Sequence, residues 1–289
     1  MKYVFFGSPE FAKTVLVKLI EAGYIPSVVV CNPDRPSGRK KIITPPAVKK
    51  LLAEKLKNYN VEIMQPDKID DDFLDKLKRM DPDLFIVAAY SKIIPDELIK
   101  IPKLGTIGVH PSILPKYRGA SPIQSAILNG DEKTGVSLFL IDEKMDHGPV
   151  IATEEIIIRN INSPVSKYYT SELTEELANT GGKLLAKILP DFLNGNIIPK
   201  QQDDSRATFI KKTRTEDAFI ELSDLEKAQG AGGKTAIEIL RKIRALNPEP
   251  GTWTLKDGKR MKILEAELTD RGNLKIKKIQ FEGKKSTDI

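Results

Sequence analysis

The apolar positions of the chain follow two patterns in turn: short continuous runs and helical spacing. Short continuous apolar runs at 2–7, 26–31 and 84–90 are typical of strands buried on both faces of a parallel sheet. Residues 11–20 instead repeat their apolar side chains at helical spacing. Because strand, helix and strand follow one another within about 30 residues, they form a βαβ unit. The pattern predicts an α/β fold built on an open, mostly parallel, Rossmann-like sheet.

The same periods extend this domain to residue 193 and then stop. Further strands are expected at 61–66, 105–110, 135–142 and 150–158, with a long helix over roughly 165–193. Residues 194–215 are polar with few aliphatic side chains, which indicates a linker. In 216–289, one helix and short strands around an Asp257-Gly258 turn predict a second, small β-barrel domain.

The stretch 105–119, GTIGVHPSILPKYRG, carries the candidate chemistry. Side chains alternate along a strand, so Gly108 and His110 share one face. Histidine at the end of a buried strand suits proton transfer at neutral pH. Ligands of open α/β sheets gather beyond the carboxyl ends of the strands. We expect the loops after 84–90, 105–110 and 135–142 to open there together, which would place Asp146 in the same crevice as His110.

Composition narrows the class of protein. The chain has 289 residues, and its hydrophobic fraction of 40% is ordinary for a globular protein. No apolar run is long enough to span a membrane, and the start lacks the pattern of a signal peptide. The single cysteine, Cys31, permits no internal disulfide. We therefore expect a cytoplasmic protein without membrane association.

Two kinds of site are disfavoured by the residues available. One cysteine and two histidines supply no metal cluster, so no metal is expected. The chain has no GxGxxG motif, and GAGGKT (230–235) lacks the first glycine of a phosphate loop. No nucleotide cofactor is expected either.

The net charge of +6 is unevenly distributed. Residues 206–289 hold 19 of the 46 basic residues and 13 of the 40 acidic ones, so the whole excess lies there. A basic segment on a neutral body indicates an acidic partner, although a solvated lysine-rich surface would give the same count.

Several motifs together carry a family resemblance. They include His110, Ser112–Pro115, Tyr117-Arg118-Gly119 and Asp146-His147-Gly148, together with NPDRPSGR (32–39), AAYSKIIP (88–95) and IRALNPEPGTW (243–253). With these motifs the chain resembles the methionyl-tRNA formyltransferase family over nearly its whole length. The resemblance implies a formyltransferase domain followed by an OB-like C-terminal domain that binds tRNA.

The resemblance also implies a reaction and its residues. The family transfers a formyl group from 10-formyltetrahydrofolate to the α-amino group of initiator methionyl-tRNA, and we expect a monomer. His110 and Asp146 match the catalytic histidine and aspartate. Folate contacts are expected from Tyr90, Ile93, Ser112, Ile113, Leu114 and Pro115. Contacts to tRNA are expected from Arg39, Lys40, Lys41, Arg241, Lys242 and Arg244.

One departure affects the catalytic group itself. Gly108 stands where the family has a catalytic asparagine that donates a hydrogen bond to the oxyanion. Loss of one such donor typically costs about 10²–10³ in rate. Three interpretations follow: another donor, either water above Gly108 or His147, replaces the asparagine; the enzyme is slow; or the protein binds folate and RNA without chemistry. We expect the first, because His110, Asp146 and the folate-loop motif are all retained.

Other functions compete with this prediction. A formyltransferase acting on a sugar nucleotide or glycinamide ribonucleotide would share the histidine and aspartate, but not the cationic loop at 32–46 and the basic C-terminal part. A non-catalytic RNA-binding protein would have no turnover to lose when His110 is replaced. A formyl-folate hydrolase would need neither basic region.

Overall fold

A computed structural model of the chain describes residues 1–38, 40–55, 59–158 and 168–289. The chain divides into two compact units. The first contains Met1–Arg118, Gly135–Glu154 and Glu175–Thr208, and the second contains Gly119–Thr134, Glu155–Thr174 and Phe209–Ile289. The chain therefore passes between the units several times. Within the described residues, no helix combines the length and apolarity needed to cross a membrane.

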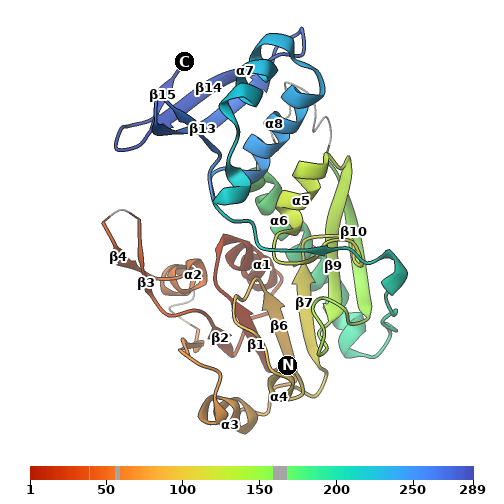
Figure 1. Ribbon diagram of the computed structural model, residues 1–289. Helices are drawn as coiled ribbons and strands as arrows, with labels where there is room; N and C mark the ends of the chain where they lie inside the picture. The colour runs from red at the N-terminus through yellow and green to blue at the C-terminus, as the bar shows by residue number, and fades with distance from the viewer. Residues whose placement is uncertain (39, 56–58, 159–167) are drawn as a thin grey trace. The chain divides into compact units, whose positions relative to one another are not determined.

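A seven-stranded sheet forms the centre of the first unit. Its order is β10-β9-β7-β6-β1-β2-β5 (Figure 1). The strands are β1 (Tyr3–Gly7), β2 (Val28–Val30), β5 (Glu62–Met64), β6 (Leu84–Ala88), β7 (Thr106–His110), β9 (Lys133–Leu140) and β10 (Val150–Ile157). Neighbours from β5 to β7 pair in parallel, which confirms the predicted open, mostly parallel sheet.

Helices accompany this sheet, and the apolar spacing at 11–20 predicted the first of them. They are α1 (Glu10–Glu21), α2 (Ala47–Lys55), α3 (Asp71–Arg79), α4 (Asp96–Ile99) and α6 (Thr170–Leu193). Helix α6 contacts the sheet at Gly181, where an added Cβ would lie 3.0 Å from the methyl groups of Val109 and Val136. Because side chains alternate along β7, His110 faces away from α6.

A small hairpin interrupts the first unit after β2. Its strands are β3 (Arg35–Ser37) and β4 (Ile42–Thr44), and Figure 1 shows them projecting beside α2. Arg35, Lys40 and Lys41 are exposed there. Asp34 anchors the base of the hairpin through Lys49, whose ammonium lies 2.9 Å from its carboxylate. The hairpin therefore presents cationic side chains to solvent.

The second unit combines helices with an antiparallel sheet. Its helices are α5 (Pro122–Asn129), α7 (Leu222–Ala231) and α8 (Gly233–Leu246). Its sheet has the order β12-β13-β14-β15, formed by Trp253–Lys256, Lys259–Leu268, Leu274–Phe281 and Thr287–Asp288. The predicted turn at Asp257-Gly258 joins β12 to β13, and both residues have positive φ, as such a hairpin requires. Apolar residues of α7, α8, β13 and β14 form the core.

Short elements complete the chain. Strands β8 (Arg118–Gly119) and β11 (Phe209–Ile210) form a two-stranded pair, and the single-turn helices η1 (Asp204–Arg206) and η2 (Glu216–Ala218) flank β11. Residues 200–208, within the stretch predicted as a linker, belong to the first unit.

Candidate functional site

His110 ends β7 and is buried, with 6% of its surface exposed. Its Nε2 lies 2.9 Å from the carbonyl oxygen of Tyr117. Because a carbonyl can only accept, Nε2 carries the proton and Nδ1 is the nitrogen left for chemistry. Tyr117 has a φ of 62°. Its left-handed conformation is held by Thr208, whose hydroxyl accepts from the Tyr117 amide at 2.8 Å.

Asp146 reaches the other side of the same ring. Its Oδ2 lies 3.7 Å from Nδ1 of His110, and 21% of its side chain is exposed. Separation by 36 positions does not prevent the contact, because the loop between β9 and β10 brings Asp146 back to β7. The expected pairing of His110 and Asp146 is therefore present in the geometry, as a carboxylate placed to stabilise a cationic imidazole.

The predicted direction of the strand at 135–142 is wrong. A parallel strand would have placed its following loop at the carboxyl end of the strand that carries His110. Strand β9 instead runs antiparallel to β7, with His110 opposite Ser137 and Ile107 opposite Leu140. The loop therefore begins at the opposite end of β7 and must return toward His110. Gly148 permits the return, because a Cβ there would overlap the carbonyl oxygen of Leu140.

The position of the missing asparagine is filled by an aromatic ring. Gly108 pairs with Phe139 across β7 and β9. A Cβ at 108 would overlap the edge of the Phe139 ring, lie 2.7 Å from its Cζ and lie 3.1 Å from Cγ1 of Ile141. Phe139 is buried and meets His110 edge to face, with centroids 6.4 Å apart. The expected water-filled space above Gly108 is therefore wrong, because Phe139 occupies it.

His147 is held by two carboxylates outside the pair. Its Nδ1 lies 2.6 Å from Oδ2 of Asp142, and its Nε2 lies 3.3 Å from Oδ2 of Asp204. Asp204 also accepts from the guanidinium of Arg118 at 2.8 Å, and this hydrogen bond lowers the pKa of the Asp204 carboxyl. With both ring nitrogens engaged, His147 braces the loop that carries Asp146, and nothing in its contacts favours a second oxyanion donor.

The expected folate residues divide into inward and outward groups. Ser112 is buried, and its hydroxyl donates to the carbonyl of Lys116. Tyr90 packs edge to face on Phe6 at 5.7 Å, and burial raises the pKa of its phenol to about 12. Ile113 is half-buried and Ile93 is 91% exposed. Ser112 and Tyr90 therefore support their loops from within.

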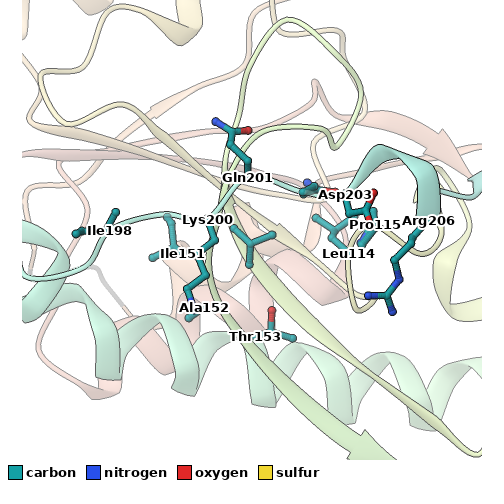
Figure 2. Close-up of a pocket in the computed structure, with 12 residues that line it drawn as sticks. Leu114, Pro115, Ile151, Ala152, Thr153, Ile198, Lys200, Gln201, Asp203 and Arg206 are labelled. Carbon is teal, nitrogen blue, oxygen red and sulfur yellow. The ribbon is translucent and has the colours of Figure 1, made fainter.

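A cavity of about 440 Å³ opens beside the turn after β7. Leu114 and Pro115 line it, together with residues 150–153 of β10, Ile198, residues 200–203 and Arg206. Figure 2 shows Leu114 and Pro115 at one end with Asp203 and Arg206, and Ile198 at the other. Lys200 and Arg206 supply positive charge. The volume falls within the range of about 300–1,000 Å³ typical of small-molecule sites.

The expected tRNA-binding cations differ in their freedom to bind. Lys40 and Lys41 are exposed on the hairpin, while Arg39 lies outside the described residues. On α8, Arg241 donates to the carbonyl of Asn129 at 3.3 Å and Lys242 donates to that of Phe219 at 2.6 Å. Arg244 is 1% exposed, and burial lowers its pKa. The expectation that Arg244 meets a phosphate is wrong for this fold, because its guanidinium is packed inside the second unit near Tyr169.

Sequence reasoning missed four residues that shape the site. Phe139 becomes the cross-strand neighbour of Gly108 only in the antiparallel register of β9, which no local sequence signal indicates. Arg118 belongs to the Tyr117-Arg118-Gly119 motif, but the motif does not indicate which residues its side chain binds. Gln202 and Asp204 lie in the predicted linker, and no local pattern marks them. Their contacts join segments more than 50 positions apart.

Comparisons with known proteins agree with this geometry. The Formyl transferase family matches residues 1–186, and the Formyl transferase, C-terminal domain family matches residues 233–274. The methionyl-tRNA formyltransferase of Caldicellulosiruptor saccharolyticus is 36% identical over 95% of this chain and 82% of its own length. That of Halalkalibacterium halodurans is 39% identical over 92% of this chain and 78% of its own length.

Solved structures share the fold at lower identity. The methionyl-tRNA formyltransferase of Clostridium thermocellum has a TM-score of 0.58 at 19% identity, covering 97% of this chain and 98% of that one. The N-formyltransferase of Helicobacter canadensis, solved with folinic acid and dTDP-3-aminofucose, has a TM-score of 0.63 at 18% identity, covering 93% and 88%. With the identity and coverage of the curated relatives, the chain belongs to the methionyl-tRNA formyltransferase family.

Proposed function

We propose that this protein transfers a formyl group from 10-formyltetrahydrofolate to the α-amino group of initiator methionyl-tRNA. The observation that carries the proposal is the 3.7 Å approach of Asp146 to His110 in a chain that is 36–39% identical to methionyl-tRNA formyltransferases over more than nine-tenths of its length. The protein is a folate-dependent formyltransferase.

Formyl transfer to an amine has three chemical requirements. The attacking amine must be neutral, a negative charge forms on the formyl oxygen, and a proton must move from the amine to the departing folate nitrogen. Nδ1 of His110 carries no proton in the neutral ring, since the N–H is on Nε2 and is committed to Tyr117. It can take the proton of the attacking amine, donate to the oxyanion as part of the imidazolium, and then pass the proton to the departing folate nitrogen. Asp146 stabilises the imidazole when it is cationic. No covalent intermediate with the protein is required.

With Gly108 in place of the asparagine, His110 is the side-chain donor that the family motif leaves in the described part of this site. Phe139 occupies the asparagine position and His147 is engaged by two carboxylates, so neither supplies a substitute. The interpretation that best fits is a slow enzyme. Loss of one donor corresponds to about 10²–10³ in rate.

The folate would bind along the turn after β7 and the loop after β6. Backbone groups of Ser91–Ile94 make no hydrogen bond to other backbone groups in the described part of the chain, so they remain available to the donor and acceptor edge of a pterin. The cavity beside Leu114 and Pro115 would take the aminobenzoyl-glutamate portion, with Lys200 and Arg206 near its carboxylates.

The tRNA would contact lysines that point to solvent. On the hairpin these are Lys40 and Lys41. In the second unit, the turns β12–β13 and β14–β15 lie at the same end of the antiparallel meander. They carry the exposed residues Lys256, Lys259, Lys284 and Lys285. Such cations bind phosphates without reading bases, so their contribution should weaken with salt.

A panel of acceptors tests the proposal. Labelled formyl-folate is incubated with the protein and initiator methionyl-tRNA, uncharged tRNA, an amino-sugar nucleotide or water alone. The expected result is labelled formyl-methionyl-tRNA and no other product. Transfer to the sugar nucleotide, or release of formate at the same rate without tRNA, would contradict it.

A further inference from the structure

Residues 202–208 contact Asp146 and also Tyr117, the residue that binds the His110 ring. Gln202 donates from its Nε2 to the carbonyl oxygens of Asp146, at 2.9 Å, and Gly148, at 2.8 Å. Farther along, the backbone of Thr208 accepts from Arg118 at 2.9 Å. Its hydroxyl accepts from Tyr117, the residue whose carbonyl binds His110. One short segment therefore fixes the backbone behind the imidazole and the backbone behind the carboxylate.

The orientation of the Gln202 amide is determined by its neighbours. Oε1 accepts from Nε of Arg118 at 3.1 Å and from Nη2 at 2.8 Å. A guanidinium only donates and a carbonyl only accepts, so Oε1 must face Arg118 and Nε2 must face the loop. Arg118 is 2% exposed and also binds Asp204. All four hydrogen bonds of the Gln202 side chain are therefore used to hold protein.

The loop that Gln202 holds has a demanding backbone. Asp146 has a φ of 49°, a left-handed conformation that residues other than glycine adopt infrequently. Such a conformation persists where the surroundings fix it. Gln202 binds the carbonyl of Asp146 itself and that of Gly148, two residues later. His147, between them, is fixed by Asp142 and Asp204.

We infer that Gln202 is a positioning residue for formyl transfer, which acts by holding the Asp146 carboxylate at its distance from His110. The inference rests on the proposed function for its kinetic consequence. Gln202 touches no reacting atom, so its effect passes through Asp146. Displacement of a catalytic group by about 1 Å can cost 10²-fold in rate, and this sets the scale of the expected loss.

A double-mutant cycle tests the inference. Gln202→Met keeps the length of the side chain and removes both donors. We expect kcat for formyl-methionyl-tRNA to fall about 10- to 100-fold with KM for the tRNA unchanged. KM for folate should change less than kcat, although Gln202 also lines the cavity beside Leu114 and Pro115. In the background of Asp146→Asn, the same change should have no further effect, because the residue through which it acts is already altered. Additive losses, or a rise in KM alone, would overturn the inference.

Two further measurements guard against trivial outcomes. Gln202→Glu keeps the acceptor for Arg118 and removes the donors, so it should lose kcat even if Gln202→Met unfolds. Gln229→Met on α7, an exposed glutamine, is the matched control and should leave kcat unchanged.

Hydrogen exchange measures how firmly the loop that carries Asp146 is held, and it does not depend on catalytic activity. The amides of 145–148 should exchange faster in Gln202→Met than in the wild type, and unchanged exchange would refute positioning. If the wild type transfers no formyl group at all, the proposed function fails while this exchange result still decides the role of Gln202.

Discussion

His110 and Arg244 are both basic side chains that are buried, yet their surroundings differ. Arg244 is enclosed in the second unit, 1% exposed, on a helix face that it shares with Leu240 one turn earlier. His110 has one nitrogen committed to Tyr117 and the other 3.7 Å from Asp146, longer than a direct hydrogen bond. Burial therefore fixes Arg244 as part of a core, whereas in His110 it orients a ring and leaves one nitrogen for chemistry.

Replacement of His110 should give the largest loss of activity. A small loss would contradict the catalytic role that separates His110 from Arg244. His110→Ala removes both the oxyanion donor and the proton carrier. General acid–base groups contribute about 10²–10⁴ in rate, so kcat should fall by at least about 10²-fold. The measurement is initial-rate formylation at saturating folate. A variant that keeps more than a tenth of wild-type kcat would show that another group carries the reaction.

Replacement of Arg244 should instead affect stability. Arg244→Ala leaves a cavity and removes the partner of Tyr169, so we expect a loss of about 2–5 kcal/mol in the free energy of unfolding. Urea denaturation measures it, and Lys259→Ala, an exposed cation of the same unit, is the control. Lys259→Ala should leave stability unchanged and reduce the salt dependence of tRNA binding by about one unit of slope. The reverse pattern would mean that Arg244 binds RNA directly.

Restoration of the family asparagine should fail by itself. In Gly108→Asn the new side chain meets the Phe139 ring, and overpacking of this kind costs about 1–3 kcal/mol. Gly108→Asn combined with Phe139→Ala has room for the amide and should raise kcat above that of Phe139→Ala alone. Stability and kcat are measured for the three variants. A single Gly108→Asn variant that is both stable and faster would contradict the role given to Phe139.

The smallest effect concerns the brace around His147. The hydrogen bond from Arg118 lowers the pKa of Asp204 below its usual 3.8. A lowered folded pKa means that the contribution to stability is complete above the ordinary pKa and disappears as pH falls through the lowered one. Wild type should therefore exceed Asp204→Asn slightly in urea stability at pH 5–6, and the difference should shrink as the pH falls below 3.8. A difference that grows in acid would contradict this sign.

The parts of the fold with a local signal could be predicted from the sequence. The apolar runs located β1, β2, β6 and β7, and Asp257-Gly258 marked a hairpin turn that the structure contains. The direction of β9 could not be predicted, because a continuous apolar run is the same in a parallel and an antiparallel strand. Gly108 and Phe139 become neighbours only once that register is known.

The site shows the same limit. His110 and Asp146 belong to motifs, so residue type and resemblance were enough to select them. Arg244 lies four residues after Leu240, and this spacing alone places it on the buried stripe of α8, a signal that its charge obscured. Gln202 joins Asp146 across 56 positions, and nothing in the polar stretch around it distinguishes it from its neighbours.

The most direct test of the account is a single-turnover formylation with enzyme in excess over charged initiator tRNA, for the wild type and Asp146→Asn. The account predicts that wild type forms formyl-methionyl-tRNA in one exponential phase and that Asp146→Asn binds both substrates equally well but reacts at least tenfold more slowly, within the range expected for general acid–base groups. Equal rates for the two proteins, or no product from folded wild type, would contradict the claim that His110 and Asp146 perform the transfer.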